Sequence, residues 1–392
     1  MITSLLVAVI LSQTPAAEPA AAAQPAAVQP APAPAPEKKP EAAKPAFPKF
    51  TVWGFIDAQW SRLDPPAPTK PTSTFELRRA RIGVKGDVTP YTGFNILWDG
   101  ADTALKDAYA NLKNVPGLPG LELRFGQWKT PFGYEQPESD TKLLWVNSSY
   151  VVNFLARATT VATASTASDS RDAGLGVIGA WDVGPVKAEL NASFVNGVGP
   201  NKKDDLEQKN LWARGGASTK VGPATVRAGL SIGNGQQVVA TGANAKFDGI
   251  GTRVDDTYQW FLTYGGDVEV DTPWFFCAAE WIRSEKDQQA FTTTGTGTAA
   301  VLAEKRSSFN ADGWYAGIFG KTPWGAGPIL RVEQYDRNEH VKGNFNRRTT
   351  VGAYYDIVAP VSSRIIFNYE LDHSDKSVKT GDKAYVFVQM MF

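Results

Sequence analysis

The sequence has little of what soluble enzymes and helical membrane proteins depend on. Its 392 residues include one cysteine, Cys277, two histidines, His340 and His373, and three methionines. A single cysteine excludes an intrachain disulfide, and its apolar context, WFFCAAEWI, assigns Cys277 a packing role. No apolar run reaches the ~18 residues that a transmembrane helix requires. These absences exclude a helical membrane protein.

Catalytic and cofactor-binding patterns are missing as well. Both histidines lie at the edges of predicted loops and match no nucleophile motif, as a hydrolase would need. Neither a metal-ligand spacing nor a Gly-rich phosphate loop is present. We therefore predict that the protein is not an enzyme, holds no metal or cofactor and has no nucleic-acid partner.

Net charge gives no direction either. Lys and Arg number 40, as do Asp and Glu, and residues 1–46 contribute equally to both signs. Any preference for ions of one sign must therefore come from where charges sit and not from their total.

The N-terminal 46 residues have a different character from the rest. The opening MITSLLVAVILSQTPA has an apolar core of roughly ten residues, which is signal-peptide length. No Lys or Arg precedes it, so a frayed apolar N-terminus is the alternative. Ala and Pro dominate the following stretch, which cannot form a core and favours extended chain. We predict a signal peptide at 1–20, a periplasmic linker at 21–46 and a folded domain at 47–392.

Aromatic residues and glycine are plentiful in that domain, with 20 Phe, 12 Trp, 12 Tyr and 36 Gly in the whole chain. Segments of about ten residues alternate between apolar and polar positions and are separated by turn residues, which predicts β-strands. The sixteen predicted strands are 50–61, 74–87, 91–99, 104–113, 121–130, 171–182, 185–196, 209–221, 223–234, 256–268, 273–285, 309–320, 326–337, 346–357, 361–373 and 381–392.

The connections between these strands alternate between short and long. Short turns such as VGP at 183–185 and 221–223 are followed by longer, more polar connections, except for one short loop near 100–103. Outer-membrane barrels have short periplasmic turns and long external loops. An all-β, transmembrane antiparallel barrel of about 16 strands follows. It places the protein in the bacterial outer membrane, in contact with lipid.

One strand indicates what the inside of this barrel contains. In FELRRARIGVKGD, period 2 puts Arg79, Arg81 and Lys85 on one face and apolar residues on the other. A charge that points into lipid costs roughly 2–4 kcal/mol at mid-strand. The three cations therefore face either a water-filled lumen or acidic partners in a solvated interior. By the same periodicity Arg124, Arg227 and Arg331 face inward, as do Glu189, Glu280 and Glu333.

Three motifs carry a resemblance to a known family. RRARIGVKGD, LKDAYANL and LRFGQWKTPFG, in that order over residues 75–135, resemble the phosphate-selective porin O and P family. The resemblance implies a 16-stranded barrel, a homotrimer, basic residues along the passage and a third external loop folded inward. Terminal Phe392 of KAYVFVQMMF resembles the signature that the barrel assembly machinery reads.

The segment 131–170 is the longest connection and lies where the family's inward loop would be. Its apolar stretch from Leu143 to Leu155 is unusual for an exposed loop, and packing on the inner wall would explain it. Arg157 follows and would project into the narrow zone. An external lid is the alternative.

Two functions follow from these patterns. The first is passive diffusion of small hydrophilic solutes, favouring anions such as phosphate, past Arg79, Arg81, Lys85, Arg124 and Arg157. The second is a structural or adhesive barrel with a plugged lumen. Asp and Glu are interspersed with the lysines of the predicted external loops, so the sequence does not fix the solute.

Overall fold

The computed structural model describes residues 47–115, 117–156, 170–203, 208–240, 257–294, 301–358 and 363–392. The predicted signal peptide and linker lie outside these residues, as does Arg157. In the described part of the chain, no helix combines the length and apolarity needed to cross a bilayer.

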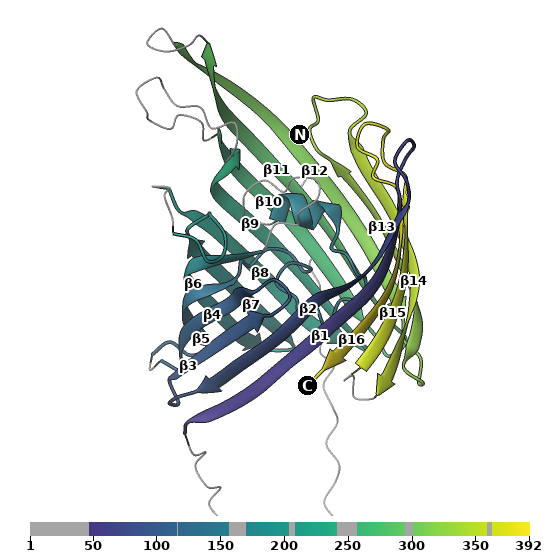
Figure 1. The fold of residues 1–392 in the computed structure, drawn as a ribbon. Coiled ribbons are helices and arrows are strands. Elements are labelled where there is room, and N and C mark those ends of the chain that lie inside the picture. The colour runs from purple at the N-terminus through teal and green to yellow at the C-terminus, as the bar shows by residue number, and fades with distance from the viewer. Residues whose placement is uncertain are drawn as a thin grey trace, which may run out of the picture. The chain divides into compact units, whose positions relative to one another are not determined.

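Sixteen antiparallel strands form one closed barrel (Figure 1). The chain closes the barrel by pairing its first strand with its last, for example Ala58 with Val388. The bounds are β1 Lys49–Asp64, β2 Thr72–Asp87, β3 Thr92–Asp99, β4 Ala104–Lys113, β5 Leu121–Lys129, β6 Arg171–Val183, β7 Val186–Val195, β8 Asn210–Val221, β9 Ala224–Ala240, β10 Thr257–Asp271, β11 Phe275–Thr294, β12 Val301–Gly320, β13 Ala326–Asp336, β14 Phe345–Val358, β15 Ser363–Asp372 and β16 Asp382–Met391.

Side chains alternate between the two faces of the wall. On β15, Ile365 and Phe367 are 39% and 45% exposed, whereas Ile366 and Asn368 are 1% and 0% exposed. The exposed positions are apolar on strand after strand, which gives the barrel an apolar outer surface. The polar and charged positions are mostly buried inside. This is the face assignment that period 2 predicts.

Two tight turns show how the sequence makes the short connections. In each VGP segment a glycine with positive φ (Gly184 at 61°, Gly222 at 59°) precedes a proline. Each Gly-Pro pair alone connects two paired strands, β6 to β7 and β8 to β9. Glycine adopts this φ without strain, and proline fixes the φ of the next residue. The alternation of short and long connections is confirmed over the described residues.

The strand count is also confirmed, but three strands extend far beyond their predicted ends. β9 continues to Ala240, β11 to Thr294, and β12 begins at Val301, so most of the predicted loop 286–308 is strand. In Figure 1 the β11–β12 hairpin rises above the rest of the wall. A strand needs about 9–11 residues to cross a bilayer. The extra residues lie beyond that span, where no apolar alternation is required.

Candidate pore and its inner loop

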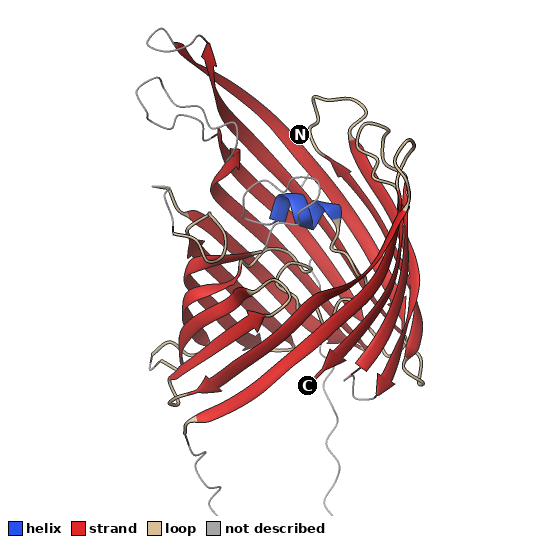
Figure 2. Ribbon diagram, viewed as in Figure 1, coloured by secondary structure: helices blue, strands red, loops and turns tan. Residues whose placement is uncertain are grey.

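The chain crosses the inside of the barrel between β5 and β6. Three backbone N–H groups of this segment bond to widely separated strands: Gly133 to Ser231 Oγ of β9 (2.9 Å), Tyr150 to Glu333 of β13 (2.6 Å) and Val146 to Asn368 of β15 (2.8 Å). Figure 2 shows its helical turn, which includes η1 Val152–Ala156, within the barrel. Residues 130–156, named the inner loop from here on, therefore occupy part of the lumen.

The apolar part of the inner loop packs against one side of the wall. Trp145, Val151 and Leu155 are at most 3% exposed and belong to a cluster that also contains Ile282 of β11 and Tyr315 of β12. Burial of such side chains stabilises a loop by about 1.5–3 kcal/mol each. Leu144 and Val146 belong to a second cluster with side chains of β13–β16. The apolar stretch 143–155 thus packs on the wall and does not face the solvent.

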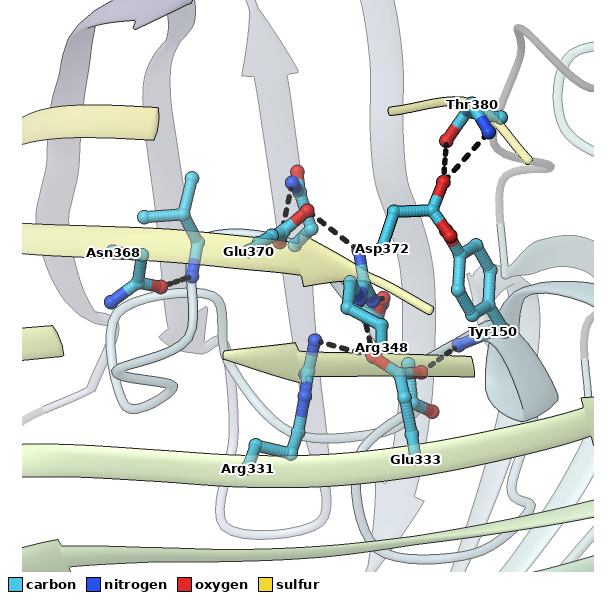
Figure 3. A network of polar contacts seen from close by, with 12 residues as sticks. Tyr150, Arg331, Glu333, Arg348, Asn368, Glu370, Asp372 and Thr380 are labelled. Atoms are coloured by element: carbon cyan, nitrogen blue, oxygen red, sulfur yellow. Dashed lines mark hydrogen bonds and ion pairs between the residues drawn. The ribbon is translucent and has the colours of Figure 1, made fainter. Parts of the chain in front are cut away.

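A polar network fixes the same part of the inner loop to β13–β15 (Figure 3). Arg348 donates to Glu333 (2.5 Å), to Glu370 (2.9 Å) and to the Ser148 carbonyl of the loop (2.8 Å). Glu333 also accepts the backbone N–H of Tyr150. All three charged side chains are nearly inaccessible. Buried charges are costly unless they are paired and hydrogen-bonded, and the inner loop supplies the remaining hydrogen-bond partners of these side chains.

Beyond β16 and β1 in the closed barrel, β2 holds the first half of the inner loop through Asp140. Arg79 bonds to Asp57 (3.1 Å) and Asp140 (3.2 Å), and Arg81 to Asp99 (2.8 Å) and Asp140 (2.5 Å). Burial opposes ionisation of Asp140. Even so, the nearby cations, of which Lys129, Arg79 and Arg81 act most strongly, hold its pKa well below the usual value.

Arg78 also points inward, which strict alternation does not predict. The register of β1 against β2 shifts between Asp57 and Ala58, and Arg78 is the extra residue. Such a bulge lets neighbouring side chains face the same way. Arg78 donates to Gln59 (2.9 Å) and to Asn147 of the inner loop (3.1 Å). The basic run in the sequence draws attention to Arg78, but the bulge decides that its side chain faces the lumen.

Lys85 and Arg124 differ from the two paired arginines. Lys85 is exposed within the lumen, lies over the Trp53 ring (5.7 Å) and has no carboxylate partner among the described residues. Arg124 lies over the Tyr109 ring (4.2 Å) and, among the described residues, forms its ion pair with Glu122 of its own strand (2.8 Å). Among the residues that the structure describes, neither Lys85 nor Arg124 forms a hydrogen bond with the inner loop.

The structure thus places four of the five predicted pore residues inside the barrel. It brings Arg79 and Arg81 together at Asp140, and it keeps Lys85 and Arg124 apart from them. Asp107, which could have neutralised the β2 cations, instead pairs with Arg171 (2.7 Å). Arg227 and Arg331 also face inward, bound to Glu269 (2.9 Å) and Glu333 (3.2 Å).

Two cavities lie between the described part of the inner loop and the wall. One, of about 320 Å³, lies against β1–β7, and the other, of about 350 Å³, lies against β6–β10. They share Pro137, Glu138 and Asn191, so they lie side by side on the β1–β10 half of the lumen. Their charged lining consists of seven cations and five carboxylates: Arg81, Arg124, Lys129, Lys142, Arg171, Arg214 and Arg227, with Asp107, Glu138, Asp140, Glu189 and Glu269.

A closed barrel with an apolar outer surface and a charged interior crosses a membrane and encloses water. The inner loop narrows this interior on one side, which is the architecture of a channel. Residues 50–392 match the family described as phosphate-selective porin O and P, and the chain belongs to this family. It is an outer-membrane diffusion channel.

Solved structures share this fold at low sequence identity. A loop L8 deletion mutant of OmpT, an outer membrane protein of Vibrio cholerae, is 11% identical with a TM-score of 0.55, covering 88% of this chain and 99% of that one. An anion-selective porin from Comamonas acidovorans is 13% identical with a TM-score of 0.55, covering 88% and 100%. OmpF of Salmonella typhi in complex with daunomycin is 13% identical with a TM-score of 0.54, covering 88% and 98%. No curated protein matches the chain.

Proposed function

We propose that this channel passes small hydrophilic solutes and favours anions, including phosphate. One observation carries the proposal: cations outnumber carboxylates along the two cavities beside the inner loop. Charges that line a narrow passage act on an ion over about 8 Å at physiological ionic strength. An excess of positive side chains there favours anions even though the net charge of the chain is zero.

The predicted pore residues have different parts in this proposal. Lys85 and Arg124 replace part of the water that an anion loses on entry. Arg79 and Arg81 contribute positive potential while they hold Asp140. Arg157 remains a proposed lining residue.

The remaining predictions complete the proposed function. We infer an exported homotrimer that performs no catalysis. Residues 1–20 would act as its signal peptide and 21–46 as its periplasmic linker. Phe392 would be read by the barrel assembly machinery.

Reversal potentials in a salt gradient test the anion preference. The purified channel in a planar bilayer should be more permeable to chloride than to potassium. Lys85→Ala with Arg124→Ala should lower this ratio about twofold or more, because both charges lie in the lumen. A channel that conducts with equal permeability for both ions would contradict the anion preference. A folded barrel without conductance would favour the plugged, adhesive alternative.

A further inference from the structure

Aromatic rings form one wall of the cavity against β1–β7. Trp53, Phe55, Tyr109 and Trp128 line it, and the inner-loop residues 137–140 lie across from them. Tyr109 and Trp128 meet edge to face, with ring centroids 6.3 Å apart. Uncharged rings add nothing to the attraction of an inorganic anion. This wall therefore favours a ligand that has an apolar face as well as a negative charge.

Three basic side chains along this wall each lie over an aromatic ring. The guanidinium of Arg81 lies 5.4 Å from the Phe55 centroid, and that of Arg124 lies 4.2 Å from Tyr109 and 5.8 Å from Trp128. The Lys85 ammonium lies 5.7 Å from Trp53. Cations and rings therefore alternate along the same surface, and a guanidinium stacked on a ring can stack on a second one.

Two glycines make room for the indoles. A Cβ on Gly83 would lie 2.8 Å from Trp53 Cε2, and a Cβ on Gly176 would lie 2.6 Å from Trp128 Cζ2. Both distances are too short for any larger residue unless an indole moves. The backbone at these two positions leaves space that the indoles fill, so Trp53 of β1 lies against β2 and Trp128 of β5 lies against β6.

Most basic hydrogen-bond donors in this cavity are already bound to carboxylates. Arg81 bonds to Asp99 and Asp140, and Arg171 bonds to Asp107. Phosphate is held by several converging charged donors. Lys129 donates to the backbone carbonyl of Glu138. What remains in the lining is the Nη1 edge of Arg124, whose Nε and Nη2 donate to Glu122, and beside the cavity the Lys85 ammonium over Trp53. Two separate cations beside rings suit a single carboxylate better than a phosphate.

We propose that this cavity is a binding subsite for aromatic carboxylates, with Arg124 and Lys85 attracting the carboxylate and Tyr109 and Trp53 contacting the ring. This inference deepens the proposed anion preference by naming a class of solute. A solute with one ring and one carboxylate is also small enough for a cavity of about 320 Å³. Binding is weak enough to allow release, because one stacked ring contributes little.

Current block by matched carboxylates tests the subsite. Benzoate and cyclohexanecarboxylate have the same charge and similar size, but only benzoate has an aromatic face. We expect benzoate to halve the chloride current of the full-length channel at roughly three- to tenfold lower concentration than cyclohexanecarboxylate. Acetate and phosphate should need higher concentrations than benzoate. Equal block by the two ring carboxylates would overturn the inference.

Three variants locate the effect. Tyr109→Leu and, independently, Trp53→Leu should each reduce the benzoate advantage, and heat-modifiable mobility on gels reports whether each variant has folded. Arg227→Gln is the matched control, because Arg227 is a lumenal cation paired with Glu269 on the other cavity. It should leave the ratio between the two carboxylates unchanged. A ratio that survives both leucine variants would also overturn the subsite.

Saturation-transfer NMR of benzoate with the purified protein separates this inference from the proposed function. Transfer that depends on Tyr109 supports the subsite even in a protein that shows no anion preference in bilayers. An anion-selective channel that gives no transfer to benzoate retains the proposed function and loses the subsite.

Discussion

The lumenal cations divide into those that hold the inner loop and those that remain available to a solute. Arg79 and Arg81 share Asp140, and Arg348 binds the loop backbone at Ser148. Lys85 and Arg124 lie over aromatic rings and, among the described residues, form no hydrogen bond with the inner loop. Substitutions in the first group therefore change both the shape and the charge of the passage, whereas substitutions in the second change its charge and its ring contacts.

Asp140→Asn tests the first group. The change removes a negative charge from the passage, so the chloride-to-potassium permeability ratio should rise about twofold or more. Reversal potentials at neutral pH measure it, with Asp182→Asn on an exposed end of β6 as the control. An unchanged ratio would mean that Asp140 lies outside the conduction path.

The pH dependence of this site follows from the lowered pKa of Asp140. A carboxyl whose pKa is depressed in the folded protein stabilises it above the unfolded value of 3.8, and this stability is lost as pH falls through the folded value. Asp140 thus stays charged between about pH 4 and 7. Any change of the chloride-to-potassium permeability ratio in that pH window therefore comes from other groups, and it should persist in Asp140→Asn.

Gly133→Ala tests the entry of the inner loop. Gly133 has a φ of 62°, and a Cβ there would lie 1.6 Å from Oε1 of Glu280, a buried side chain. Gly343→Ala is the matched control, with a φ of 73° and nothing within 4 Å of its Cβ. Backbone strain alone costs about 1–2 kcal/mol at either site. The temperature at which the barrel unfolds, measured by the loss of its heat-modifiable mobility on gels, should fall further for Gly133→Ala than for Gly343→Ala. Equal decreases in the two variants would contradict the predicted clash.

Residue facing could be predicted from the sequence wherever the alternation is unbroken. Leu330 and Arg331 lie on the faces that period 2 gives them. Arg78 does not, because a bulge adds one residue to β2 and the sequence does not mark where. The sequence also could not predict that Asp140 anchors the inner loop, because its partners Arg79 and Arg81 lie on β2, far from it in the chain.

At the level of elements, the inner loop is held on two sides by different forces. Its apolar half packs on β11 and β12 and is also bonded to β13 and β14 through Glu333 and Arg348, whereas its acidic half is held by ion pairs with β2. Deletion of about 141–160 removes the apolar half and should raise single-channel conductance, because that volume becomes water. Deletion of 66–70, in the exposed connection after β1, should leave conductance unchanged. Unchanged conductance in a folded 141–160 deletion would contradict this.

Strand positions within the wall were predictable, but the outer ends of β9, β11 and β12 were not. The alternation that marks a strand arises from lipid on one side and water on the other. Beyond the bilayer both faces meet water, and Gly, Thr and Ala segments such as FTTT lose the pattern while the hydrogen bonding continues. A sequence rule built on hydropathy therefore ends strands where the membrane ends.

For the whole molecule, the apolar outer surface predicts behaviour that is simple to measure. The protein should fractionate with outer membranes and should migrate faster on gels before boiling than after, because the closed barrel stays compact in detergent. Recovery in the soluble fraction after osmotic shock would contradict the barrel's insertion in lipid.

The pairing of β1 with β16 has a consequence for how the molecule forms. Every other pair of neighbouring strands is adjacent in sequence, but this seam joins residues more than 300 positions apart, such as Asp57 and Gln389. Loop-closure entropy makes such a contact late. Until it forms, two strand edges expose unpaired N–H and C=O groups, which lipid cannot satisfy. The seam also brings Phe392 to Gly54 through two backbone hydrogen bonds (2.9 and 3.0 Å). A circular permutant that joins these ends and opens at the connection 65–71 would keep every strand pair, with a new and equally distant seam between β1 and β2.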